Sequence, residues 1–176
     1  ALLSLYKYQR YKSIPPEEQQ ELKELTLLLS NKEMSRPAHD AVKYGQISAD
    51  AVYFTRDLIN TPSQDKTPTI LAEGAKKIAK ELGIQCIVLS FPELKKLGMG
   101  GLLGVAQGSV QPPKFIILEY NARAKNQDTI VFVGKGITFD SGGICLKQAK
   151  DMDLMKSDMS GAAAVMGSIK AIARMK

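Results

Sequence analysis

Residues 131–165 read VFVGKGITFDSGGICLKQAKDMDLMKSDMSGAAAV, and the predicted fold follows from this stretch. Its first residues complete a continuous apolar run over 129–134, which is typical of a strand buried on both faces. Glycines follow at once, and they allow positive φ or close approach of two backbones. Small residues then begin a helical pattern over 161–175. The stretch therefore predicts strand, loop and helix in succession, the unit from which α/β proteins are built.

The flanking sequence continues this alternation. Apolar periodicity and capping residues predict helices over 17–30, 38–59, 69–82 and 93–97, and further strands over 84–89 and 115–120. Thr67 and Pro68 suit the start of one helix, and Gly83 suits its end. The run GMGGLLGVAQGS at 98–109 holds five glycines and is predicted to be a loop. We expect an α/β fold, a layered sheet with helices on both faces.

Composition narrows the class of protein. The chain has 176 residues, 44% of them hydrophobic and 24% charged, which is typical of one globular domain. The net charge of +6 is spread along the chain, which argues against nucleic acid as a partner. No apolar run approaches the ~18 residues of a membrane span. Two widely separated cysteines, Cys86 and Cys145, are predicted to be reduced, buried thiols, which points to the cytoplasm.

The chain contains a single histidine, His39. This count excludes a zinc finger and the zinc sites that need two or three histidines. A Ser-His-Asp triad would have to use His39, and no serine lies in a GxSxG sequence. Any metal chemistry must therefore rely on oxygen ligands or on an unusual nitrogen.

Charged residues gather just after the predicted strand 129–134. They are Lys135, Asp140, Lys147, Asp153, Lys156 and Asp158. Ligand sites in open α/β sheets lie beyond the carboxyl ends of strands. One interpretation is a phosphate cradle in a nucleotide-binding module, although GxxxxGK[ST] is absent and carboxylates would repel phosphate. A second is a glycine-rich turn with surface ion pairs, and a third is a site for hard divalent cations.

The motifs in this stretch resemble those of the leucyl (cytosol) aminopeptidase family, whose members are dinuclear metallopeptidases. The family pattern is VGKGxTFDSGG, a lysine a few residues on, and then MDxMKxDMxGAAAV, and all of these elements are present. The resemblance also covers DLINTPSQ (57–64), GMGGLLGVAQGS (98–109) and PPKFIILEY (112–120). It implies a helical interdomain segment at 1–35 and the N-terminal part of an aminopeptidase catalytic domain at 36–176.

The resemblance assigns a role to each matching residue. It implies that Lys135 and Asp158 bind one metal and that Asp140 bridges two metals. It implies that Lys147 is catalytic, holds the substrate carbonyl and stabilises the gem-diolate. Met155 would line the pocket for the first side chain of the substrate. Asp153 and Lys156 receive no role. The cofactors implied are two divalent ions, Zn or Mn, with Mg or Co as further options.

The implied activity is removal of an N-terminal residue, leucine and similar, from peptides by a water that two metals activate. The resemblance also implies peptide substrates, a homo-hexamer and a cytoplasmic location. The family completes its site with an Asn-Thr-Asp-Ala-Glu-Gly-Arg stretch, which does not occur in this sequence. We therefore expect the chain to be a fragment that covers the first part of the catalytic domain. The alternative is a catalytically incomplete fragment that acts as a structural or assembly module.

Overall fold

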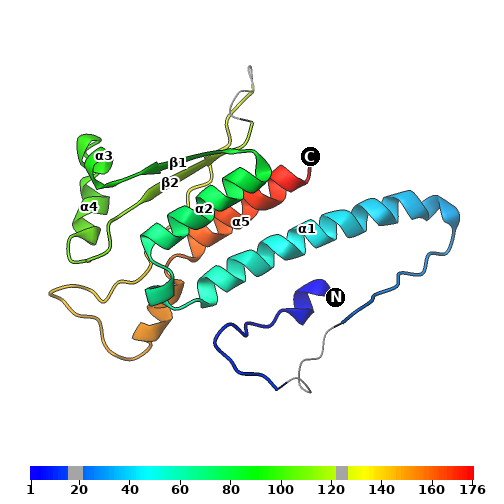
Figure 1. Ribbon diagram of the computed structural model, residues 1–176, viewed down its shortest axis with the longest axis horizontal. Coiled ribbons are helices and arrows are strands. Elements are labelled where there is room, and N and C mark those ends of the chain that lie inside the picture. Colours follow the sequence, from blue (N-terminus) through cyan, green and yellow to red (C-terminus); the bar gives the residue numbers. More distant parts are fainter. Residues whose placement is uncertain (16–21, 122–126) are drawn as a thin grey trace.

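The computed structural model describes residues 1–15, 22–121 and 127–176. Its three long helices are α1 (Ser35–Asn60), α2 (Pro68–Leu82) and α5 (Ser160–Arg174). α5 packs between α1 and α2, so that the three lie side by side (Figure 1). The shorter helices α3 (Phe91–Lys96) and α4 (Gly100–Ala106) lie together at one end of the sheet.

The sheet has two antiparallel strands, β1 (Gln85–Leu89) and β2 (Phe115–Glu119), among the described residues. Its register pairs Cys86 with Leu118 and Val88 with Ile116. The side chains of Cys86, Ile116 and Leu118 pack on a cluster formed by α2 and α5. Helices layered on a sheet confirm the predicted α/β class.

The core lies where α1, α2, α5 and the sheet meet. One cluster contains Leu71, Met159 and Ala163, and a second contains Ala75, Ile78 and Met166. α1 and α5 approach closely at Gly167, where an added Cβ would lie 2.3 Å from the Thr55 hydroxyl oxygen. A side chain there would have to displace the Thr55 hydroxyl and press on the Ala51 carbonyl oxygen at 3.1 Å, so glycine suits this contact.

The local signals around α2 are confirmed. The Thr67 side chain accepts a hydrogen bond from the amide of Ile70, as an N-cap residue does, and Pro68 follows it. Gly83 ends the helix with a φ of 66°, in the left-handed region. The expected helix over 38–59 corresponds to α1, and the strands over 84–89 and 115–120 correspond to β1 and β2.

Two expectations for loops and strands are wrong. Residues 100–106 of the predicted glycine loop form the helix α4. Backbone hydrogen bonds form there despite the glycines: the Leu103 amide donates to the Met99 carbonyl at 3.1 Å. The predicted strand over 129–134 is not a strand in the structure. Its apolar side chains are largely exposed, Ile130 by 80% and Val133 by 90%, and a strand without a hydrogen-bonded neighbour gains no stability.

The predicted helix over 17–30 is also not found. Residues 16–21 lie outside the described residues, and the described part, 22–30, is not helical. The leucines that would form its apolar face are exposed, Leu25 by 55% and Leu28 by 93%. A helix of this length depends on packing of its apolar face, and within the described part of the chain these leucines stay largely exposed.

The two cysteines are free thiols, as expected, but they are not buried as predicted. Cys86 is half-buried beneath α2, and Cys145 is exposed on the glycine loop. None of the described helices combines the length and the apolar character that a membrane crossing requires. The division into 1–35 and 36–176 stays a prediction.

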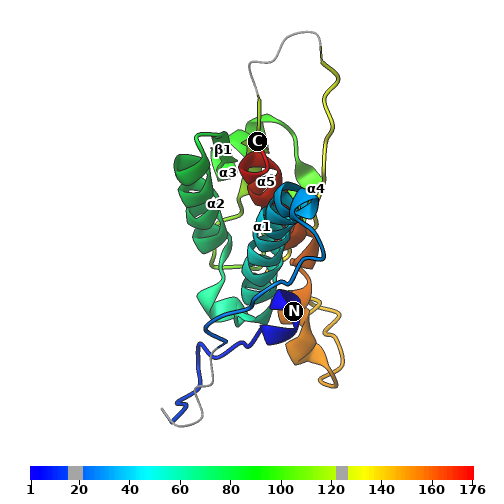
Figure 2. The ribbon, with the colours of Figure 1, turned by 90° about the vertical axis from the view of Figure 1, so that its right-hand side faces the viewer.

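The N-terminal residues lie along the second half of α1 (Figures 1 and 2). Three tyrosine hydroxyls make side-chain contacts there. Tyr6 donates to Asp57 at 2.8 Å, Tyr8 shares a hydrogen bond with Thr61 at 3.0 Å, and Tyr11 donates to Asp65 at 2.5 Å. The N-terminal segment therefore holds the end of α1 and the loop that follows it.

Candidate functional site

The first part of the site lies where the start of α5 meets the segment that carries Lys135. The Ala162 amide of α5 donates to the Lys135 carbonyl at 2.9 Å. The two backbones touch through glycines: a Cβ on Gly134 would lie 2.3 Å from the Gly161 oxygen, and one on Gly161 would lie 2.8 Å from the Lys135 nitrogen. Only residues without side chains permit this approach, which fixes the backbone of Lys135 against α5.

Alanine at position 134 tests this contact. We expect Gly134→Ala to lower the free energy of unfolding by about 1–3 kcal/mol, because the atoms that its Cβ would meet belong to the backbone and cannot rotate away. Urea unfolding measures the change. Gly104→Ala is the matched control, since its Cβ would meet nothing within 4 Å and alanine favours the helix α4. Equal stabilities for the two variants would show that the contact at Gly134 is not tight.

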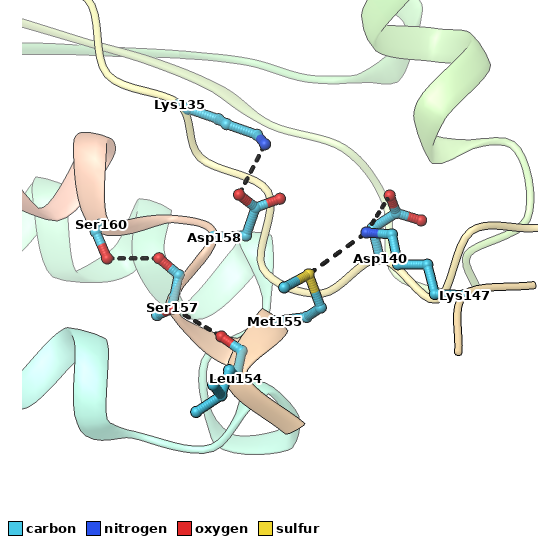
Figure 3. Close-up of polar contacts among 8 residues, drawn as sticks. All are labelled: Lys135, Asp140, Lys147, Leu154, Met155, Ser157, Asp158 and Ser160. Carbon is cyan, nitrogen blue, oxygen red and sulfur yellow. Dashed lines mark hydrogen bonds and ion pairs between the residues drawn. The ribbon is translucent and has the colours of Figure 1, made fainter. Parts of the chain in front are cut away.

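Lys135 forms an ion pair with Asp158. The Lys135 Nζ and Asp158 Oδ1 atoms are 2.7 Å apart (Figure 3). Asp158 directly follows the 3₁₀ helix η5 (Met152–Ser157). The next residue, Met159, is fully buried in the core and begins the connection to α5. The core thus anchors the backbone of Asp158, while the Lys135 side chain stays 59% exposed.

Asp140 lies in the glycine loop and is held from two sides. Its Oδ1 accepts from the Gly142 amide at 2.7 Å, and its Oδ2 lies 3.1 Å from the Lys147 Nζ. The Gly142 hydrogen bond, followed by Lys147 and then the charge of Lys135, holds the pKa of Asp140 below its usual value. Gly142 has a φ of 103°, and a Cβ there would lie 2.4 Å from the Cys145 carbonyl oxygen. This loop conformation therefore requires glycine.

Lys147 connects Asp140 to the η5 turn. Its Nζ donates to the Met155 sulfur at 3.4 Å, and its backbone amide donates to the Ser141 carbonyl at 2.8 Å. Figure 3 shows Met155 between the Lys147–Asp140 pair and the turn that leads to Asp158. The ammonium of Lys147 thus faces one carboxylate and one thioether.

The structure places the predicted residues in two adjoining groups, Lys135 with Asp158 and Asp140 with Lys147 and Met155. It does not bring the two carboxylates into contact, and the bridging role of Asp140 stays a prediction. Within the described ranges, no three His, Cys, Asp or Glu side chains gather as a metal cluster. The site offers two carboxylates, Asp140 and Asp158, each paired with one lysine, so its charges balance.

Sequence reasoning missed two residues that hold the site. The Ser63 hydroxyl, in η4 (Ser63–Asp65), donates to the Thr138 carbonyl at 2.8 Å, close to Asp140. Lys66 is fully buried, and its Nζ donates to the Lys156 carbonyl at 2.8 Å. A buried lysine looks like any surface lysine in a sequence, so no signal in the chain separates it from the other lysines.

Burial gives Lys66 a pH dependence of its own. Its desolvation, and next the charge of Lys156, lower the pKa of Lys66 to about 8 from 10.5. Between these two values the unfolded chain binds more protons than the folded chain, so this group makes the free energy of unfolding rise with pH. Relative to Lys66→Met, which cannot titrate there, we expect the parent to gain stability between about pH 8 and about pH 10. Urea unfolding across this range measures the difference, and a constant difference would contradict the lowered pKa.

Comparisons with known proteins cover nearly the whole chain. The family model "Cytosol aminopeptidase family, catalytic domain" matches residues 53–176. A probable cytosol aminopeptidase of Roseiflexus castenholzii is 44% identical over 177 residues, which are 100% of this chain and 36% of that protein. Its counterpart in Acidithiobacillus ferrooxidans is 46% identical over 173 residues, 97% of this chain and 35% of that protein.

A solved structure is similar as well. The bottromycin maturation enzyme BotP in complex with Mn superposes with a TM-score of 0.78 at 34% identity. The match covers 98% of this chain and 34% of that chain. The chain thus spans about a third of the length of the relatives that it matches.

Proposed function

The chain belongs to the cytosol aminopeptidase family, and on that premise we propose that it supplies part of the active site of a metal-dependent aminopeptidase. The reaction would be hydrolysis of the N-terminal residue, leucine and similar, from peptides. Two Lys–Asp contacts carry the proposal: Lys135 with Asp158 at 2.7 Å, beside the start of α5, and Lys147 with Asp140 at 3.1 Å, beside Met155 of η5. Family membership confirms the resemblance seen in the motifs. The comparisons do not favour the alternative of an assembly module.

Lys135, Asp140 and Asp158 are the residues that would hold metal ions. Their donor chemistry fits hard or borderline divalent cations such as Zn or Mn, with Mg or Co as further options, since carboxylate oxygen is the ligand these ions share. A lysine can contribute a lone pair only without its proton, so Lys135 would exchange its ion pair with Asp158 for coordination. Three donors are a partial ligand set, and water or other residues would complete it. When bound, two divalent ions lower the pKa of a water and polarise the peptide carbonyl.

Lys147 would act differently, by keeping its proton. Its ammonium is fixed by the Asp140 carboxylate at 3.1 Å and the Met155 sulfur at 3.4 Å. A positive charge held in place before reaction stabilises the negative charge that develops on the carbonyl oxygen as water attacks. Met155 would contact the first side chain of the substrate, because a flexible thioether adapts to unbranched and branched apolar groups alike.

The remaining family properties are proposals for the full-length gene product. They are peptide substrates, a homo-hexameric assembly and a cytoplasmic location. The names of the relatives, cytosol aminopeptidases, support the activity and the location.

The requirement for a free amino terminus tests the proposed activity. With Mn²⁺ present, we expect the full-length gene product to release the chromophore from leucyl p-nitroanilide and to leave N-acetyl-leucyl p-nitroanilide intact, because acetylation removes the amine that an aminopeptidase recognises. A chelator should abolish the first reaction. The absorbance of released p-nitroaniline, at saturating substrate, measures the rate of cleavage of each anilide. Equal cleavage of the two anilides, or cleavage that persists in chelator, would contradict a metal-dependent aminopeptidase.

A further inference from the structure

We propose that Lys66 is a positioning residue of this active site, whose buried ammonium holds the turn carrying Met155 and Asp158 against the end of α1. The inference rests on the proposed function, and it adds a residue to which the family motifs assign no role. Lys66 lies in the loop between α1 and α2, outside the 131–165 stretch.

The ammonium of Lys66 uses all of its hydrogens. Its Nζ donates to the Leu58 carbonyl at 2.8 Å, the Ile59 carbonyl at 3.3 Å and the Lys156 carbonyl at 2.8 Å. An ammonium has three N–H donors, so the group is saturated. The residue has no exposed surface and is among the largest fully buried side chains in the described part of the chain. No water is needed to complete this arrangement.

The acceptors of these bonds lie at the ends of two helices. Leu58 and Ile59 belong to the last turn of α1, and Lys156 belongs to the last turn of η5. Carbonyls in a last turn lack partners within the helix and carry the negative end of its dipole. Across the described ranges, no carboxylate lies within 4.0 Å of the ammonium. The charge of Lys66 is therefore balanced by backbone carbonyls, which gives the contact a fixed direction.

The η5 turn needs such a tie. None of its residues from Met152 to Ser157 is buried, so its side chains do not anchor it in the core. The Lys66 bond reaches the carbonyl one residue after Met155 and two residues before Asp158. A shift of this carbonyl would therefore move the thioether that contacts Lys147. It would also disturb the Asp158 carboxylate, whose backbone the buried Met159 anchors only from the other side.

An apolar side chain of similar length would fill the same space without burying a charge. It would provide no donors, and the three carbonyls would lose their shared partner. Burying a charge costs free energy. In some proteins such a charge favours one arrangement of the groups around it over the alternatives. Here the specified arrangement is the placement of η5 relative to α1.

The test compares Lys66→Met and Lys66→Gln with Ile78→Ala in the full-length gene product. Ile78 is buried in α2 within the cluster that contains Ala75 and Met166, so its truncation lowers stability without touching η5. Three quantities are measured at a temperature where every variant is folded: the melting temperature, the Kd for Mn²⁺ by calorimetry, and kcat and KM for leucyl p-nitroanilide. Lys66→Gln keeps two N–H donors on a shorter side chain and serves as the conservative variant.

We expect Lys66→Met to weaken Mn²⁺ binding by about 10–100-fold, as loss of a group that orients a ligand does. KM should rise as well, because Met155 moves with the turn, and Lys66→Gln should lie between Lys66→Met and the parent. Ile78→Ala should lower the melting temperature and leave the Mn²⁺ affinity within about twofold of the parent, since it removes no group that orients a ligand.

Two results would overturn the inference. One is a Lys66→Met protein whose Mn²⁺ affinity and KM match those of Ile78→Ala, which would make Lys66 a purely structural residue. The other is failure of both Lys66 variants to fold, which leads to the same conclusion. A parent protein that binds no Mn²⁺ and cleaves no anilide would instead refute the proposed function, and the inference with it, before any variant is compared.

Discussion

Replacing Lys147 by methionine is expected to lower kcat for leucyl p-nitroanilide by about 10²–10³-fold, the loss found when a group that stabilises an oxyanion is removed. Mn²⁺ affinity should stay unchanged, because the proposed role of Lys147 is that of an ammonium and not of a ligand. Steady-state kinetics at saturating Mn²⁺ and calorimetry measure the two quantities on the same protein.

The structure supports a selective effect of this substitution. Asp140 keeps its hydrogen bond from the Gly142 amide when Lys147 is replaced, so the carboxylate stays in place. The backbone bond from the Lys147 amide to Ser141 also remains. Lys150→Met is the control, because Lys150 is an exposed lysine of the same loop. Equal kcat values for the two variants would show that Lys147 has no part in the reaction.

Replacing Lys135 by methionine is expected to weaken Mn²⁺ binding by more than about 100-fold, since changes at residues that merely orient a ligand cost 10–100-fold. The stability of the metal-free protein should change little. The Lys135 side chain is 59% exposed and the Asp158 side chain 23%, so solvent screens the lysine end of the pair, and we expect a contribution of about 1 kcal/mol or less. Calorimetric titration and thermal unfolding without metal measure the two effects.

Arginine at this position sharpens the test. Lys135→Arg keeps the positive charge and could keep the contact with Asp158, but guanidinium has no lone pair to give to a metal. We expect it to lose Mn²⁺ affinity as completely as Lys135→Met. Retained affinity in the arginine variant would mean that Lys135 acts only as a counter-charge for Asp158.

The predictable parts of the fold are those that residues close together in the sequence determine. The cap at Thr67 and the left-handed Gly83 fix the ends of α2 through neighbouring backbone groups, and both were visible in the sequence. The helices α1 and α5 pack against each other through their apolar faces, so both form as the sequence predicts.

The failures arise where the outcome depends on a partner that a pattern cannot supply. The leucines around Leu25 have helical spacing but no surface to pack on among the described residues, and Ile130 lies in an apolar run with no neighbouring strand there. The error at α4 has the opposite cause. Its glycines predict a loop, but the backbone hydrogen bonds of a helix form there in spite of them. Cys145 is predicted to be a buried thiol, and the glycine loop exposes it instead.

For the site, the motifs named the residues but not how they are held. The order of short motifs predicts Lys135, Asp140, Lys147, Met155 and Asp158 as site residues, and the structure places them in two adjoining groups. The glycine contact between positions 134 and 161 and the buried Lys66 are tertiary features, and they require coordinates. The sequence therefore predicts which residues form the site, and the structure adds the contacts that hold these residues in place.

Lys135 and Lys147 have opposite proposed tasks in adjoining parts of one site, metal coordination and charge stabilisation, and one comparison separates them. Mn²⁺ is titrated by calorimetry into the full-length gene product and into its Lys135→Met and Lys147→Met variants under the same conditions. We expect the Lys135 variant to lose Mn²⁺ binding and the Lys147 variant to bind Mn²⁺ as the parent does. Equal affinities in the two variants, whether both weak or both strong, would contradict these proposed tasks.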